Sequence, residues 1–113
     1  MRLETTLVKA AVEFLRFKGF VCWRQNVGAV SATHKGKTRF IRFGVRGVSD
    51  IIGCSPTGRF LAAEAKVGKN KLTPDQQLFL ASVRDVGGIA VVFWSLDDLA
   101  DGIRGTNGKV KKL

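Results

Sequence analysis

Two acidic residues and one lysine in this chain have the types and spacing to bind a metal ion. Asp50 comes directly before one short apolar stretch, and Glu64 and Lys66 stand at the end of the next one. Residues opposite each other on paired antiparallel strands share a face of the sheet, and the side chains of one strand alternate between faces. If the two stretches pair so that Asp50 faces Glu64, Lys66 joins them on that face. Two carboxylates and an ammonium group then meet.

The segment between the acids predicts this pairing. It reads as two apolar strands joined by a turn over 55–58. Pro56 suits the first central position of a type I turn, and Gly58 suits the left-handed residue that closes a three-residue loop. This loop sets Asp50 opposite Glu64, whereas a slip of one residue would send the two acids to opposite faces.

Two adjacent carboxylates among apolar neighbours suggest a bound cation. They repel each other, and their burial is costly unless a cation or a proton lies between them. Mg²⁺ is a suitable occupant because it prefers a few carboxylate oxygens together with water and phosphate oxygens. The alternative is a cross-strand ion pair or a solvated hairpin face. Taken as three residues alone, the pattern leaves both interpretations open.

The composition favours a polyanionic partner. Nineteen Lys and Arg residues against nine Asp and Glu give a formal net charge of +10 on 113 residues and a pI near 10.3. Between Phe14 and Ser49 there is no acid, and the eight basic residues are Arg16, Lys18, Arg24, Lys35, Lys37, Arg39, Arg42 and Arg46. A membrane surface is a weaker interpretation, because these residues lie mostly in a loop-and-strand pattern and not along one face of an amphipathic helix.

The length and the apolar pattern bound the class of protein. A chain of 113 residues suits one small domain with a single core. No apolar stretch approaches the ~20 residues that span a bilayer, and the first residues lack the apolar core of a secretion signal. We therefore expect no membrane partner and a cytoplasmic protein. Cys22 and Cys54 lie in apolar, strand-like stretches, so we expect both to be free thiols in the core.

The remaining elements follow from periodicity and from capping signals. The predicted elements are a helix over 3–18, a strand over 20–25, a loop over 26–37 with a turn at 34–37, a strand over 38–43, the hairpin over 50–66, a helix over 74–86, a buried strand over 89–94 and a short helix over 96–100. Thr73 is expected to cap the second helix, with Pro74 at its first position. We expect one domain over 1–103 and a basic, flexible tail over 104–113.

Four motifs in this order resemble those of a known nuclease family. They are Gly-Val-Arg-Gly-Val-Ser-Asp-Ile-Ile-Gly over 44–53, Glu-Ala-Lys over 64–66, Leu-Thr-Pro-Asp-Gln over 72–76, and Gly-Gly at 87–88 before the apolar strand. The chain resembles, over nearly its whole length, the small stand-alone VRR-NUC domains of phages and bacteria, in the PD-(D/E)XK nuclease superfamily. That resemblance implies an α/β fold with a restriction-endonuclease-like αβββαβ core, in which helices flank a central mixed β-sheet. It also implies a bacterial or phage-infected host cell.

The resemblance also implies a role for each residue of the acidic site. Asp50 and Glu64 would ligate Mg²⁺ or Mn²⁺ with help from the Ala65 carbonyl, and Lys66 would orient or activate the attacking water. Glu4, on the first helix, matches an acid that supports the metal through water. The alternative for Glu4 is a first-turn acid that the helix dipole favours. Family members often carry a proline where this chain has a serine directly before the first acid.

Gln76 has two competing interpretations. The resemblance places it near the catalytic Lys66, whereas its spacing from Thr73 is that of a capping box, in which the glutamine side chain returns to the amide of the cap residue. We expect one side chain not to do both, and we favour the catalytic site. The neighbouring Gln77 is expected to be a solvated helix residue.

Branched DNA is the substrate that the resemblance implies, and stand-alone members look like dimeric Holliday-junction resolvases. Because the chain carries one site, paired cleavage of two strands requires a homodimer. The predicted DNA-contacting residues are Lys35, Lys37, Arg39, Arg42, Arg46, Lys69 and Lys71. His34 is expected to be a surface residue. The alternatives are a flap or single-strand nuclease of the same superfamily, and a basic nucleic-acid-binding module without catalysis.

Overall fold

The computed structural model describes residues 3–25, 29–42 and 44–104. Its elements are α1 (Leu3–Phe17), β1 (Val21–Arg24), β2 (Ala29–His34), β3 (Lys37–Arg42), β4 (Ile51–Cys54), β5 (Phe60–Ala65), α2 (Pro74–Asp85), β6 (Ile89–Phe93) and α3 (Leu96–Arg104). Without the β2–β3 hairpin and the last helix, the order is αβββαβ. The predicted fold class is therefore confirmed.

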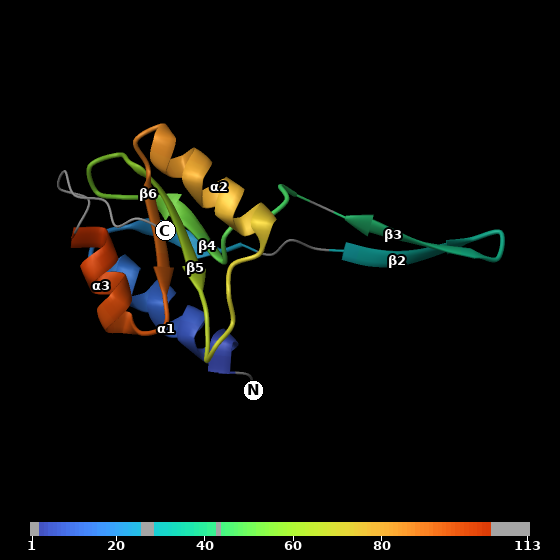
Figure 1. The fold of residues 1–113 in the computed structure, drawn as a ribbon, viewed down its shortest axis with the longest axis horizontal. Helices are drawn as coiled ribbons and strands as arrows, with labels where there is room; N and C mark the ends of the chain where they lie inside the picture. Colours follow the sequence, from blue (N-terminus) through green and yellow to red (C-terminus); the bar gives the residue numbers. More distant parts are fainter. Residues whose placement is uncertain (1–2, 26–28, 43, 105–113) are drawn as a thin grey trace.

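A mixed four-stranded sheet forms the middle layer of the body (Figure 1). The strand order is β1-β4-β5-β6; the first two pairs are antiparallel, and β5 and β6 are parallel. A parallel pair needs a crossover connection, which α2 provides. Leu15 of α1 and Leu99 of α3 share a buried cluster with one face of the sheet, and Leu80 of α2 packs into a separate cluster on the other face.

The hairpin that carries the acids has the predicted register. Ile51 pairs with Ala63, and the Ser55 amide donates to the Arg59 carbonyl at 2.8 Å. Gly58 has a φ of +88°, the left-handed conformation that closing this loop requires. Counting outward from these pairs places position 50 opposite position 64, as the sequence predicts.

The loop predicted over 26–37 is wrong for residues 29–34, which form β2. This strand pairs antiparallel with β3 through a two-residue turn, in which Lys35 has a φ of +52° and Gly36 a φ of +76°. Two left-handed residues match the twist of a hairpin. The small and polar residues of β2 carry a weak strand signal, so it is the pairing with β3 that makes this segment a strand. Residues 26–28 and 43, which the predicted loop and strand include, lie outside the described residues.

The last helix runs beyond Ala100, where its end was predicted, to Arg104. Its start is fixed by a capping pair, because Ser95 Oγ accepts the Asp98 amide at 3.1 Å and Asp98 Oδ2 accepts the Trp94 amide at 3.0 Å. A glycine at position 102 does not break the helix, since it lets α3 pack closely on Val91 of β6. The predicted tail lies, except for its first residue, outside the described residues.

The two cysteines differ in burial. Cys22 is buried on β1, and burial is the main cause that raises the pKa of its thiol. Cys54 is only partly buried. Both are free, and the core assignment is thus confirmed for Cys22 and holds in part for Cys54. No helix in the described part of the chain is long and apolar enough to cross a membrane.

Candidate active site

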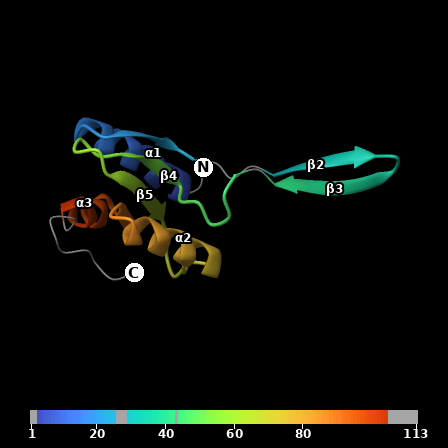
Figure 2. The same cartoon turned by 90° about the horizontal axis from the view of Figure 1, so that it is seen from above.

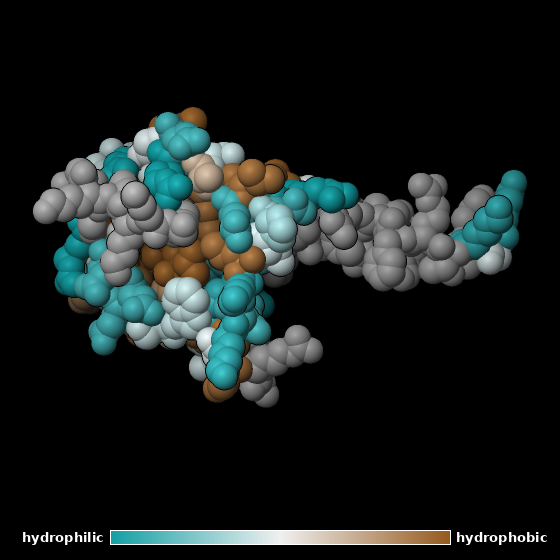
Figure 3. Space-filling model, viewed as in Figure 1, coloured by the Kyte–Doolittle hydropathy of each residue, from teal (hydrophilic) through white to brown (hydrophobic). Residues whose placement is uncertain are grey.

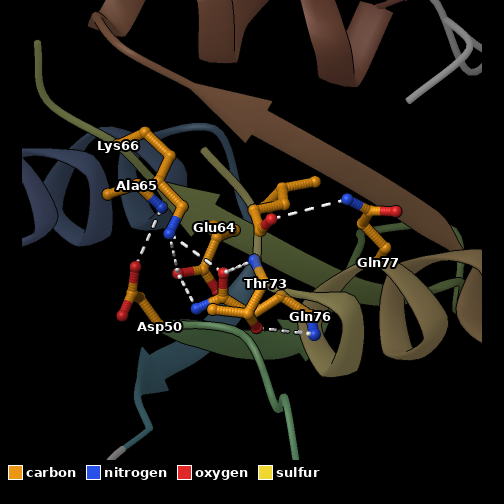
Figure 4. Close-up of polar contacts among 8 residues, drawn as sticks. Asp50, Glu64, Ala65, Lys66, Thr73, Gln76 and Gln77 are labelled. Atoms are coloured by element: carbon orange, nitrogen blue, oxygen red, sulfur yellow. Dashed lines mark hydrogen bonds and ion pairs between the residues drawn. The ribbon is translucent and has the colours of Figure 1, made fainter. Parts of the chain in front are cut away.

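The acidic residues meet at one end of the sheet because β4 and β5 are antiparallel. Asp50 directly precedes β4, Glu64 lies near the end of β5, and Lys66 follows it (Figure 4). The parallel crossover brings the start of α2, with Thr73 and Gln76, to the same place. Strand order and strand direction thus bring together side chains from three segments of the chain.

Asp50 is held by backbone groups on both sides. Its Oδ2 accepts a hydrogen bond from the Ala65 amide at 2.9 Å, and its carbonyl accepts one from the Gln25 amide at 2.6 Å. Hydrogen bonds to a carboxylate fix its orientation and are stronger than those between neutral groups. The Ala65 contact seen here is through the amide, and a role for the Ala65 carbonyl stays a prediction.

Glu64 is a buried carboxylate with one oxygen unsatisfied. Only 3% of the residue is exposed. Oε2 accepts from Gln76 Nε2 at 3.2 Å and lies 3.9 Å from Lys66 Nζ. Oε1 is buried without a hydrogen-bond partner among the residues that the structure describes. A buried oxygen of this kind is costly, so it marks a place where a cation or a proton would be stabilising.

The surroundings of Glu64 favour its protonated form. Burial, first, and then the charge of Asp50 and a hydrogen bond that the protonated form of Glu64 would donate to it raise the pKa of Glu64 from 4.5 to about 8, and the charge of Glu4 adds to the rise. Lys66 acts in the opposite direction. A proton on Glu64 and a divalent cation would therefore compete for the same site.

Lys66 is buried as well and is held by two partners. It is 8% exposed, and its Nζ donates to Gln76 Oε1 at 2.9 Å. Glu64 Oε2 lies 3.9 Å from the same nitrogen. Burying an ammonium group is costly unless hydrogen-bond acceptors such as Gln76 Oε1 lie beside it. The Lys66 ammonium group is therefore held at a fixed position beside Asp50 and Glu64.

Gln76 does both of the things that were expected to exclude each other. Its Oε1 accepts from the main-chain amide of Thr73 at 2.9 Å. The main-chain amide of Gln76 donates to Thr73 Oγ1 at 3.2 Å, which completes the capping box. The same Oε1 accepts from Lys66, and Nε2 donates to Glu64. The expectation of a single role was wrong, because a carbonyl oxygen has two lone pairs and accepts two hydrogen bonds.

Thr73 is a member of this network that sequence reasoning assigned to the helix cap alone. By fixing the Gln76 side chain, the cap also fixes the acceptor of the Lys66 ammonium group. The Thr-x-x-Gln spacing was the sequence feature that could have revealed this role. We interpreted the capping box as an alternative to the site, whereas the capping box is part of the site. Gln77 is exposed and donates to the Leu72 carbonyl at 3.4 Å, away from the acids (Figure 4).

The loop that leads into Asp50 packs against the start of α2. Gly47 has a φ of +72°, and a Cβ there would lie 2.1 Å from the Asp75 carbonyl oxygen. Arg46 Nη1 lies 3.8 Å from Asp75 Oδ2, between two exposed side chains. Ser49 is fully buried, and its Oγ has no partner within the described part of the chain. This close approach fixes the position of Asp50 relative to the start of α2.

Replacing Gly47 by Ala is expected to destabilise the protein more than replacing Gly44. Both glycines have positive φ, but a Cβ at Gly44 would have no described atom within 4 Å. Gly44→Ala therefore reports the left-handed strain alone, about 1–2 kcal/mol. Gly47→Ala adds a clash with backbone atoms, for a further ~1–3 kcal/mol. Urea unfolding of the two variants measures the difference, and equal free energies of unfolding would show that the loop does not pack on α2.

Glu4 lies close enough to affect the site. It is partly buried in the first turn of α1, and its charge contributes to the raised pKa of Glu64. A first-turn acid is also favoured by the helix dipole. The two interpretations of Glu4 are thus compatible, and support of a metal through water stays a prediction.

The basic residues predicted to contact DNA do not form one cluster. By element they divide into a hairpin group, Lys35, Lys37, Arg39 and Arg42, and a group nearer the acids, Arg46, Lys69 and Lys71. The two tip lysines are exposed, whereas the side chains of His34 and of both β3 arginines lie outside the described part. Lys69 and Lys71 are exposed on the segment between β5 and α2. DNA contact by either group stays a prediction.

The donor set fits a hard divalent cation that keeps water or phosphate ligands. Within 3–25, 29–42 and 44–104 no group of three or more His, Cys, Asp or Glu residues is arranged to enclose a metal ion. Two carboxylates, one with a buried unpartnered oxygen, remain. Mg²⁺ is usually bound in this way, by one or two carboxylates together with water and substrate phosphate oxygens.

Comparisons of the chain with models of protein families, with curated proteins and with solved structures found no match.

Proposed function

We propose that the protein is a metal-dependent DNA endonuclease that hydrolyses phosphodiester bonds. The observation that carries this proposal is the buried Glu64, with an unpartnered oxygen, next to Asp50 and Lys66. A module that only bound DNA would gain nothing from two carboxylates facing a phosphate, because they repel it. The order of the motifs, which resembles that of the VRR-NUC nucleases, supports the same chemistry.

Asp50 and Glu64 would hold the cation, Mg²⁺ or Mn²⁺. When bound, such an ion polarises the phosphate and lowers the pKa of a bound water. The protein's contribution is to hold both carboxylates in place beforehand. The Ala65 amide orients Asp50, and Gln76 orients Glu64. These contacts fix the orientation of both carboxylates where the cation would bind.

Lys66 would stabilise negative charge on the phosphate during cleavage. Its ammonium group is held at 2.9 Å by Gln76 and is largely shielded from solvent, where a charge acts more strongly than in water. We assign to Lys66 the orientation of water and the stabilisation of charge.

Branched DNA is the proposed substrate. A formal net charge of +10 favours a polyanion, and phosphate contacts supply most non-specific affinity. The sequence has no helix-turn-helix or zinc-finger spacing to read bases, which favours recognition of DNA shape. Since each chain has one site, a homodimer would place two sites on two strands, as a Holliday-junction resolvase requires.

The test incubates the purified protein with a four-way junction, a flap and a plain duplex, each with Mg²⁺, Mn²⁺, Ca²⁺ or EDTA. Paired nicks in the junction that need Mg²⁺ or Mn²⁺ and disappear in Asp50→Asn are the expected result. Cleavage of the flap alone would retain the chemistry and change the substrate. Tight junction binding without cleavage under any of the metals would contradict the nuclease and leave a DNA-binding module.

A further inference from the structure

The β2–β3 hairpin is an excursion that the sheet does not require. Its two neighbours in the chain, β1 and β4, pair directly, and Arg24 lies opposite Ile51. Two residues suffice to join antiparallel strands at such a point. The chain instead uses the whole of residues 25–50 there. Because the fold closes without this segment, its presence needs another explanation.

The hairpin stands apart from the body. It forms a two-stranded sheet of its own, with six residues in each strand, and it projects from the end of the body in both views (Figures 1 and 2). A two-stranded hairpin alone in water is marginally stable at best. It therefore gains from a partner along its length.

The charge of the hairpin points to the kind of partner. Residues 25–49 contain no Asp or Glu, and their basic residues are Lys35, Lys37, Arg39, Arg42 and Arg46. Figure 3 shows a hydrophilic tip, where residues 35–37 are exposed. Acid-free strands of this charge repel a second copy of themselves and attract a polyanion.

Both ends of the excursion are tied to the candidate active site. At the start, the Gln25 amide donates to the Asp50 carbonyl at 2.6 Å. At the end, residues 44–49 lead directly into Asp50 and pack on α2 through Gly47. A polyanion bound along the hairpin would thus continue toward the carboxylates.

We propose that the β2–β3 hairpin is an arm that lies in a groove of the DNA duplex next to the cleaved bond. The proposal rests on the proposed function for the identity of the substrate. A two-stranded β-ribbon fits the major groove of B-DNA. At ~3.3 Å per residue, a six-residue strand reaches about 20 Å, which is about six base pairs. The arm adds affinity only where the DNA offers that length of duplex.

The first experiment measures DNA binding in EDTA, so that no cleavage occurs, as a function of the duplex length beside the branch point. Wild-type affinity is expected to fall about tenfold when each flank is cut to fewer than about six base pairs. Lys35→Gln/Lys37→Gln is expected to lower affinity for the long-flank substrate and to reduce the slope of log K against log salt by about 1–2. It should also lose the dependence on flank length.

The matched control is Lys9→Gln/Lys18→Gln, which removes the same charge from two exposed lysines, one on α1 and one in the turn that follows it. Its affinity and its flank dependence are expected to match those of the wild type within about twofold. Equal losses in the two double variants would overturn the arm, because net charge alone would then explain the effect. A wild-type affinity that is independent of flank length would overturn it too.

A second variant replaces residues 29–42 by a short Gly-Ser linker, after circular dichroism has shown that the body stays folded. The proposal predicts unchanged sedimentation and a loss of the flank dependence. A shift to a smaller oligomer with flank dependence retained would assign the hairpin to the contact between copies. These binding results test the arm even if no cleavage is found. If the wild type cleaves DNA but the arm variants bind DNA as the wild type does, the proposed nuclease function stands and only the proposed role of the hairpin is contradicted.

Discussion

Lys66→Met is expected to lower the single-turnover rate of DNA cleavage by about 10³-fold. The substitution keeps the length of the side chain and removes the buried ammonium group that Gln76 Oε1 accepts from at 2.9 Å. Loss of a fixed group that stabilises charge in a water-poor site costs roughly 10²–10³-fold in rate, and Lys66 is proposed to orient water as well. The measurement uses enzyme in excess over a labelled four-way junction, so that substrate affinity does not enter.

The fold is expected to tolerate Lys66→Met. Gln76 keeps its contact with the Thr73 amide, and an apolar side chain replaces a charge that was costly to bury. Junction affinity in EDTA should stay within a few fold of that of the wild type. The control is Lys9→Met, which removes an exposed lysine of α1 and should leave the rate unchanged. Cleavage by Lys66→Met within tenfold of the wild-type rate would remove Lys66 from the chemistry.

Without metal, the protein is expected to become less stable as the pH rises, because Glu64 then loses a proton that stabilises the folded state. The folded pKa is about 8 and the unfolded value is 4.5, so the folded state retains a proton that the unfolded state releases between these values. The stabilising contribution is complete below pH 4.5 and is lost as the pH rises through 8. At about 1.4 kcal/mol per pKa unit, the difference between 4.5 and about 8 corresponds to a loss of up to about 5 kcal/mol.

Glu64→Gln isolates this effect because glutamine has the same shape and does not titrate. The variant accepts from Gln76 Nε2, as Glu64 does, and offers an amide to the neighbouring Asp50. Urea unfolding in EDTA should therefore show a difference in the free energy of unfolding that grows from pH 5 to pH 8 in favour of the variant. Parallel pH profiles would contradict a raised pKa at Glu64.

At pH 8, added Mg²⁺ should make the wild type more stable than Glu64→Gln. An ion that binds only the folded state stabilises it by RT ln(1 + [L]/Kd), so the wild type gains stability as Mg²⁺ is added. Glu64→Gln lacks the second carboxylate and should gain little. This comparison needs no DNA and no cleavage. A wild type that Mg²⁺ and Mn²⁺ both fail to stabilise would leave Asp50 and Glu64 as a structural, protonated pair.

The register of the β4–β5 hairpin was predictable because the residues of its loop set it. Pro56 and Gly58 each suit one position of a short loop, and a loop of fixed length leaves one pairing of the strands that follow. That pairing is enough to place the two acids on one face of the sheet. The strand β2 could not be predicted in this way, since its small residues have little preference of their own and depend on pairing with β3.

The αβββαβ core was implied by the family resemblance. The sequence by itself determined the acids, their common face, the helix caps and the basic charge. All of these depend on residues that are near in the chain, on side-chain periodicity or on composition. Only the tertiary structure decided that Gln76 bonds the helix cap and the Lys66–Glu64 pair together, that Glu64 Oε1 is buried without a partner among the described residues, and that Gly47 packs on α2. These depend on the crossover that brings the start of α2 to the end of β5, and contact between distant segments is set by the packing of the whole sheet.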